Sequence, residues 1–293
     1  MIGNIQKLIL LTLITLVTVS CQNGRHPNEQ LDTKNNEGII IKREFMTKDQ
    51  RTKFIIINND QLNNTYVNQI TSDTQKFYNK LIPNYENKNY KWDKQITIDL
   101  KMGDGISTGM KKNISLYNAV GGNYLLCHEL THTLLGFGNQ KANEFNIENG
   151  YFSQEGMAVY LQEKLDPQKK VFPTNSLKLD SIVKYLNENN RIIPLENLAS
   201  NTLGQTYFNS SDKEISNKLL WESYIEAGSF VKYLIDNYGI NKFLKVYNSH
   251  NFKGSVKKVY GEELKDLEKE WLINIDTKAK SLDMNERVQI LYP

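Results

Sequence analysis

The sequence predicts an α+β protein with an N-terminal α/β lobe and a mostly helical C-terminal lobe. Between residues 38 and 138, strand-length runs of β-branched residues alternate with helical periodicity. Beyond Lys164, nearly all apolar residues recur at the spacing of helices. The 293 residues, 39% of them hydrophobic, suffice for one large domain or two small lobes. The formal charge of +3 gives no reason to expect a nucleic-acid partner.

Residues 1–20 have the pattern of a signal peptide. Lys7 precedes an apolar stretch, residues 8–19, that is too short for an ordinary transmembrane helix. The sequence Thr18-Val19-Ser20-Cys21 resembles a bacterial lipobox, although Thr18 stands where Leu is usual. This resemblance implies an exported lipoprotein of the cell envelope, anchored to the membrane through Cys21. Ordinary signal-peptidase cleavage is the alternative.

Residues 21–37 are polar and rich in turn-forming residues, which predicts a flexible tether. The folded domain is expected over residues 38–280, with its first lobe ending at residue 138 and its second covering 139–280. Residues 281–293 are expected to form a tail.

The first lobe is expected to contain strands joined by one long helix and to end in a second helix. β-Branched runs such as Ile39-Ile40-Ile41 indicate strands, and apolar residues at helical spacing indicate helices. The strands are expected over residues 39–41, 54–57, 95–100 and 113–117, and the helices over residues 64–81 and 125–135. Gly136 and Gly138 are expected to end the second helix.

The second lobe is expected to be a series of helices. They are predicted over residues 153–161, 177–186, 195–203, 215–238, 241–247 and 262–275. Gly239 and Gly261 are suitable helix ends.

The helix over residues 125–135 contains the sequence His128-Glu129-Leu130-Thr131-His132. Residues four apart lie on one face of a helix, so His128 and His132 can direct two imidazoles at one point. That geometry suits Zn²⁺, which takes two histidines and a carboxylate and keeps a fourth position open. Two histidines with ordinary partners are the alternative. Five leucines around the motif predict a buried helix, which would not normally bury these polar groups without a shared task.

The third metal ligand has three carboxylate candidates, because no histidine follows His132 until His250. Glu144 and Glu148 lie in a polar stretch and are expected to face water. Glu155 lies in the first turn of an apolar helix, where an inward-facing carboxylate needs a compensating cation. Its alternative role is to stabilise the start of that helix. Cys127 is expected to be a small buried residue and not a metal ligand. Because it is adjacent to His128 on a helix, its side chain points about 100° away from that of His128.

His128-Glu129-x-x-His132 followed by Glu155-Gly156-x-Ala158-x-Tyr160 resembles the gluzincin peptidases. This thermolysin-like group includes the membrane-alanyl-aminopeptidase family and bacterial peptidase MA-like proteins. The resemblance implies a thermolysin-like zincin catalytic domain over residues 38–280, with Zn²⁺ as cofactor and Glu155 as its third ligand. The 22 residues between His132 and Glu155 exceed the common spacing, and the extra residues are expected in the preceding loop.

A second resemblance lies downstream, where Tyr224-Ile225-Glu226-Ala227-Gly228-Ser229 is similar to the gluzincin helix whose tyrosine points at the scissile carbonyl. It implies that the Tyr224 hydroxyl stabilises the oxyanion. The alternative is that Tyr224 is a core aromatic. Tyr207 is a weaker substitute for the role.

These features predict zinc-dependent hydrolysis of a peptide or protein substrate, with Glu129 as the general base. The aminopeptidase branch carries a Gly-x-Met-Glu-Asn strand, whereas residues 109–113 are Gly-Met-Lys-Lys-Asn here. If Lys111 and Lys112 face the cleft, they would repel a free amine, which favours an endopeptidase. The alternatives are an aminopeptidase of the same clan, a surface binding module with a structural zinc site, and a non-peptide zinc hydrolase.

Overall fold

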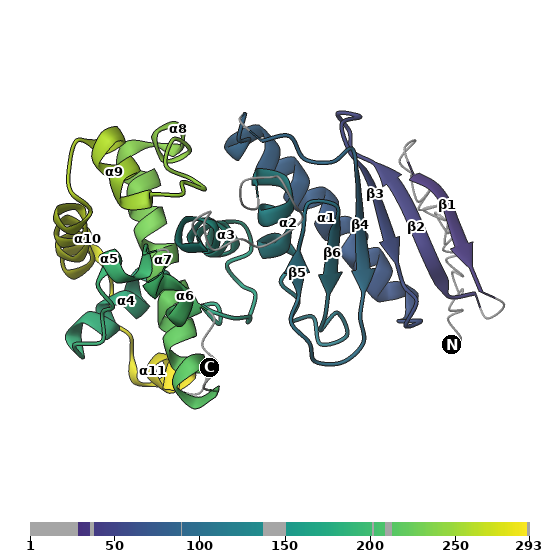
Figure 1. Ribbon diagram of the computed structural model, residues 1–293. Helices are drawn as coiled ribbons and strands as arrows, with labels where there is room; N and C mark the ends of the chain where they lie inside the picture. Colours follow the sequence, from purple (N-terminus) through teal and green to yellow (C-terminus); the bar gives the residue numbers. More distant parts are fainter. Residues whose placement is uncertain are drawn as a thin grey trace, which may run out of the picture.

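The computed structural model describes residues 29–35, 38–88, 90–136, 151–200, 202–208 and 213–291. A sheet with two helices packed beside it occupies one side of the molecule, and the remaining helices occupy the other (Figure 1). The predicted combination of a sheet and many helices is therefore confirmed.

The sheet is mixed, with the strand order β1-β2-β3-β4-β6-β5. Strands β3, β4 and β6 run parallel to one another, and the other neighbours are antiparallel. Ile56, Ile98 and Ile114 stand in register on the three parallel strands and are fully buried. The strands are β1 (Glu29–Lys34), β2 (Ile40–Met46), β3 (Lys53–Ile57), β4 (Gln95–Leu100), β5 (Thr108–Gly109) and β6 (Asn113–Leu116).

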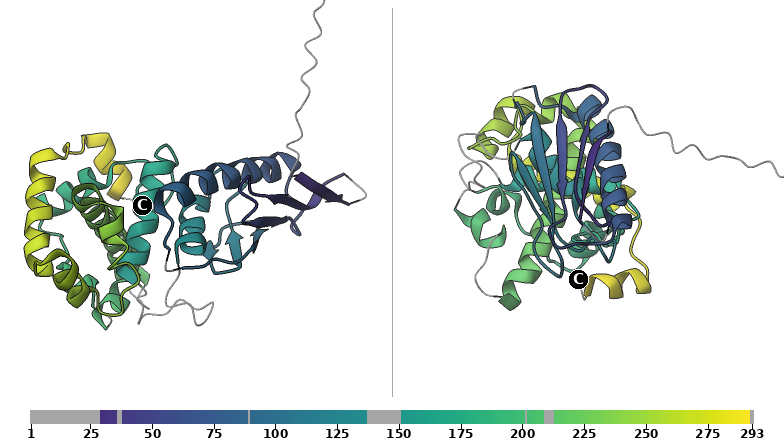
Figure 2. Two further views of the ribbon diagram at one scale, coloured as in Figure 1. Left: turned by 90° about the horizontal axis from the view of Figure 1, so that it is seen from above. Right: turned by 90° about the vertical axis from the view of Figure 1, so that its right-hand side faces the viewer.

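Helix α1 (Asn64–Tyr85) runs along one face of the sheet (Figure 2). The Asn63 side chain accepts a hydrogen bond from the Thr65 N–H and caps its start. Val67, Ile70 and Phe77 recur at helical spacing, and all three are buried. The apolar face predicted from the sequence is therefore the face that covers the sheet.

Strand β1 contradicts the prediction that residues 21–37 form a flexible tether. Glu29–Lys34 pairs antiparallel with β2, and the Arg43 guanidinium donates two hydrogen bonds of 2.8 Å to the Asp32 carboxylate. A strand at the edge of a sheet is held by backbone hydrogen bonds and such ion pairs, so its polar sequence carries no apolar signal. Residues 21–28, 36 and 37 lie outside the described residues.

The helices differ from the predictions at four places. The helix predicted over residues 241–247 ends at Phe243, as α8 (Ile240–Phe243). The helix predicted over 195–203 is two short helices, α5 (Leu195–Leu198) and α6 (Leu203–Phe208), and the Ser200 hydroxyl accepts a hydrogen bond from the Leu203 N–H at the break. Helix α9 (Phe252–Tyr260) was not predicted, although Phe252, Val256 and Tyr260 recur four residues apart and are buried. Helix α11 (Met284–Leu291) forms within the predicted tail.

Apart from these differences, the helices after α1 follow the predicted order. They are α2 (Leu126–Leu135), α3 (Tyr151–Leu165), α4 (Leu179–Glu188), α5 (Leu195–Leu198), α6 (Leu203–Phe208), α7 (Lys213–Tyr238), α8 (Ile240–Phe243), α9 (Phe252–Tyr260), α10 (Leu264–Lys278) and α11 (Met284–Leu291).

Helix α2 lies between the sheet and the helical side of the molecule, and all ten of its residues are buried. Side chains from both sides satisfy carbonyl groups at its C-terminal end. Tyr90 donates to the Thr133 carbonyl at 3.2 Å, Asn87 donates to Leu135 at 3.1 Å, and Tyr247 donates to Gly136 at 2.9 Å. Gly136 ends the helix as predicted, with a φ of 120° that suits glycine.

Two glycines allow α3 and α7 to pack closely. A Cβ atom at Gly156 would lie 2.6 Å from the Ala227 carbonyl oxygen, and one at Gly228 would lie 2.5 Å from Val159 Cγ1. Both distances are too short for packed atoms, so either side chain would push the helices apart. The spacing of α3 and α7 therefore depends on these glycines.

Candidate metal centre

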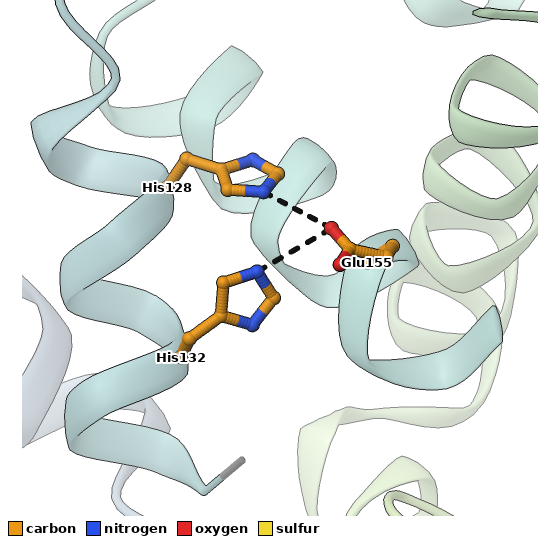
Figure 3. A group of neighbouring side chains, drawn as sticks. All are labelled: His128, His132 and Glu155. Carbon is orange, nitrogen blue, oxygen red and sulfur yellow. Dashed lines mark hydrogen bonds and ion pairs between the residues drawn. The ribbon is translucent and has the colours of Figure 1, made fainter. Parts of the chain in front are cut away.

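His128, His132 and Glu155 converge at the contact between α2 and α3 (Figure 3). The Nε2 atom of His128 lies 3.1 Å from Glu155 Oε2, and the Nε2 atom of His132 lies 3.3 Å from the same oxygen. All three side chains are buried, with 3–6% of each exposed. Within the described part of the chain, no other histidines, cysteines or carboxylates form such a group of three or more.

The geometry of this group fits a zinc ion. In a tetrahedral site, metal–ligand bonds of about 2.1 Å separate neighbouring ligand atoms by about 3.4 Å. The two Nε2–Oε2 distances of 3.1 and 3.3 Å are close to that separation. Two imidazoles and a carboxylate are also the ligand types of a three-ligand catalytic zinc site.

The electrostatics of Glu155 agree with this assignment. Burial acts to raise the pKa of its carboxyl group, but the adjacent His132 and His128 outweigh burial and lower that pKa to about 2. Glu155 is therefore ionised at neutral pH, as a carboxylate ligand must be. The Glu155 carboxylate is buried, and the two histidines beside it offset the cost of burying its charge. The alternative role, an exposed carboxylate that stabilises the start of a helix, does not describe it.

The other candidate ligands are placed differently. Glu144 and Glu148 lie outside the described residues. His250 is exposed in the loop between α8 and α9 and does not belong to the group. Cys127 is buried, and its sulfur contacts the Leu161 carbonyl oxygen at 3.8 Å.

Glu129 lies beside the metal-ligand group without belonging to it. Burial raises the pKa of its carboxyl group to about 7, and the nearby Glu155 adds to this, while His128 and a hydrogen bond from the Gly109 N–H act against it. A cation bound at the metal-ligand group would act against this increase and lower the pKa of Glu129. A Cβ atom at Gly109 would lie 2.3 Å from the Glu129 carbonyl oxygen, so glycine lets strand β5 reach α2.

Tyr224 reaches the site from α7. Its ring stacks on the His128 imidazole, with ring centres 6.2 Å apart and an interplanar angle of 17°. Burial, followed by the Glu155 and Glu129 charges, raises the pKa of its hydroxyl well above the ordinary value. The hydroxyl is therefore a hydrogen-bond donor at neutral pH. Tyr224 lines the cavity at the site, whereas Tyr207 packs against the core and does not.

Sequence reasoning missed several residues that line the same cavity. Tyr151 lies on α3 one turn before Glu155, and this spacing of four residues was the available signal. Phe208, at the end of α6, stacks against Tyr151 with ring centres 6.2 Å apart. Residues 106–108 come from the loop and short strand before β6, where no periodic pattern marks them.

A groove extends to both sides of the metal-ligand group. A cavity of about 360 Å³ lies between α3, α6 and β5, and a second of about 540 Å³ lies toward the loop over residues 170–172. Both cavities are lined by His128, Glu129 and Tyr224, so they meet at the site. Strand β5 is the last strand of the sheet within the described residues, and it lines the first cavity.

The structure does not place Lys111 and Lys112 in this groove. Neither residue lines the two cavities, and the Lys112 ammonium lies 3.7 Å from the Asp93 carboxylate. The predicted repulsion of a substrate amine by these lysines therefore has no support. Both lysines lie in the turn between β5 and β6, so closeness to Gly109 along the chain does not place them in the groove.

Comparisons with known proteins give one distant structural likeness. No family model matches the chain, and no curated protein matches it. The structure is similar to that of a variant of an M1 zinc metallopeptidase from Deinococcus radiodurans, with a TM-score of 0.42 and 10% sequence identity. The match covers 87% of this chain and 52% of the other, so this chain spans about half the length of that protein. A likeness this distant carries no weight for the function.

Metal analysis of purified protein tests the site. The wild type is expected to bind about one Zn²⁺ per chain, and His128→Ala, His132→Ala or Glu155→Ala should each weaken Zn²⁺ binding by more than about 100-fold, because losing a ligand costs more than losing an outer-shell partner. His250→Ala is the matched control and should bind as the wild type does. Equal zinc contents in all five proteins would exclude the site.

Proposed function

We propose that the protein is a zinc-dependent peptidase. The observation that carries this proposal is the convergence of His128, His132 and Glu155 on one point at the floor of a groove, with the Glu129 carboxylate beside them. A group of three ligands that opens into a groove leaves room for a fourth, exchangeable ligand, which is the arrangement of catalytic zinc sites.

Each residue of the site has a task in this proposal. Zn²⁺ in this group would act as a Lewis acid and lower the pKa of water towards about 7. Glu129 takes the proton from the attacking water and later gives it to the leaving amine nitrogen. The Tyr224 hydroxyl donates a hydrogen bond to the oxyanion that develops on the former carbonyl oxygen. Its high pKa keeps the proton on that hydroxyl throughout.

The shape of the groove favours a peptide as substrate. The β5 edge faces the cavity, and an extended peptide can pair with the edge of a sheet through backbone hydrogen bonds. The groove continues on both sides of the metal-ligand group, so a chain could pass through it. Glu129 and Glu155 are the only carboxylates that line it among the described residues, and neither is available to hold an amino terminus. We therefore favour an endopeptidase over an aminopeptidase.

A binding module with a structural zinc site is the rival from another class. Structural zinc sites are closed by four protein ligands. The described group supplies three, and the groove opens directly onto it. A buried carboxylate beside the metal also has no use in a structural site, and it costs free energy to keep there. These observations favour the enzyme.

Digestion of a peptide library with blocked termini tests the function. We expect the wild type loaded with Zn²⁺ to cleave internal bonds, and Glu129→Gln to keep its zinc while losing about 10²- to 10⁴-fold in rate, since the amide cannot accept the proton. Glu163→Gln is a matched control. Glu163 is also buried, but it lies away from the groove and accepts a hydrogen bond from the Leu179 N–H. If neither the zinc-loaded wild type nor the control cleaves any peptide, the peptidase function is rejected. If only peptides with a free amino terminus are cleaved, the protein is an aminopeptidase.

Tyr224→Phe separates a catalytic tyrosine from a packing one. The phenyl ring preserves the stacking on His128, so zinc content and folding should not change, whereas kcat should fall about 100-fold when an oxyanion donor is lost. Tyr207→Phe serves as the control and should keep the wild-type kcat. An unchanged kcat in Tyr224→Phe would leave Tyr224 with a packing role only.

We also propose that the protein is exported and anchored to the membrane through a lipid on Cys21. The support is the lipobox-like sequence, which lies outside the described residues. Among the described helices, none is both long enough and apolar enough to span a membrane. Metabolic labelling with a radioactive fatty acid should label the wild type and not Cys21→Ser. A labelled Cys21→Ser variant, or an unlabelled wild type, would reject the anchor.

A further inference from the structure

The second cavity is lined by several apolar residues and by a single lysine, Lys170. Six of its lining residues form a pocket that we call the Lys170 pocket: Leu125, Lys170, Val171, Phe172, Leu220 and Trp221. Val171 and Trp221 are buried, with 7% and 2% of their surfaces exposed, while Lys170 is exposed. The pocket meets the metal-ligand group at His128 and Tyr224, so a group bound in it lies next to the reacting atoms.

The wall of this pocket is fixed to the helices that carry the site. The Gln162 side chain, on α3, donates a hydrogen bond of 2.9 Å to the Phe172 carbonyl. The Trp221 indole, on α7, donates one of 2.8 Å to the Pro173 carbonyl. The Phe172 ring also contacts the Tyr224 ring edge to face, with centres 5.1 Å apart. Lys170 therefore projects from a loop whose position is set relative to Glu155 and Tyr224.

The charge of Lys170 is not neutralised within the described part of the chain. Its ammonium group forms no ion pair there, in contrast to Lys112, which lies 3.7 Å from Asp93. Apart from Glu129, no described carboxylate lines the second cavity. Besides His128 and Tyr224 at the metal-ligand group, the other polar lining residues are three asparagines and Ser107, which are uncharged. An unpaired cation at the rim of an apolar pocket attracts an anion on the molecule that fills the pocket.

We propose that Lys170 is a specificity-determining residue that pairs with a carboxylate of the bound peptide, close to a bulky apolar side chain held in the Lys170 pocket. This inference rests on the proposed peptidase function. The carboxylate can be an Asp or Glu side chain or the C-terminal carboxylate of the peptide. Both present the same charged oxygens to an ammonium group.

Three sets of matched peptides test the proposal and distinguish these sources. All carry one Phe in a neutral, N-terminally blocked sequence. The first set moves a single Asp through the positions around Phe and ends in an amide, and the second has no Asp and ends in a free carboxylate. The reference set has Asn in place of Asp and ends in an amide. The full-length chain loaded with Zn²⁺ is assayed for kcat/KM on each peptide.

For the wild type, the best carboxylate peptide should exceed its reference about fivefold in kcat/KM, the size expected for a partly exposed ion pair. In Lys170→Met that ratio should fall to about one, and in Lys170→Glu a peptide with Lys in place of Asp should become the better substrate. Lys178→Met removes an exposed lysine that does not line either cavity and should keep the wild-type ratio. Preference for the first set assigns a side chain, and preference for the second assigns the terminal carboxylate.

Peptide binding separates this inference from the peptidase proposal. Dissociation constants of the same peptides are measured with Glu129→Gln and with Glu129→Gln/Lys170→Met. Tighter binding of carboxylate peptides that depends on Lys170 supports the inference even if the wild type cleaves nothing. Cleavage without a carboxylate preference, or with one that persists in Lys170→Met, overturns the inference and leaves the peptidase intact. If the protein neither binds nor cleaves any of these peptides, both the inference and the peptidase proposal are overturned.

Discussion

The structure depends on the burial of two imidazoles and two carboxylates at the contact between α2 and α3. Each of these groups loses its hydration inside the protein, and an unpaired buried charge is costly. The arrangement offsets that loss by bringing one oxygen of Glu155 within 3.3 Å of both histidine Nε2 atoms. A metal ion at this point would satisfy all three groups together. The burial and convergence of these groups are the physical basis for assigning a metal centre.

This contact sets requirements on distant parts of the chain. Helix α3 has to approach α2 at a fixed distance, and its own position follows from close packing on α7 through Gly156 and Gly228. The end of α2 is held by Asn87 and Tyr90 before it in the chain and by Tyr247 far after it. The same packing carries Tyr224 to the site and fixes the loop that bears Lys170. Catalytic geometry and substrate selection would thus share one rigid framework.

Most helices and the central strands could be predicted because their signals are local. Strand β4 begins and ends as predicted from its alternation, α1 and α7 were found from apolar periodicity, and α2 and α3 were found from their apolar sequences. The elements without such a signal were missed. Strand β1 is polar and gains its order from backbone pairing with β2, and β5 has two residues, too few for any periodic pattern. Helix α9 is an exception, since its three buried residues were spaced helically.

The sequence by itself determined the pairing of His128 with His132, because a separation of four residues on a helix fixes two side chains on one face. Only the tertiary structure brought Glu155 to them, since that meeting depends on how α3 packs and not on its distance along the chain. It likewise placed Tyr224 at the groove, turned Lys112 towards Asp93, and put Lys170 at a pocket rim that no motif marks. Local periodicity is set by interactions within a few residues, whereas a site assembled from several helices is set by their packing.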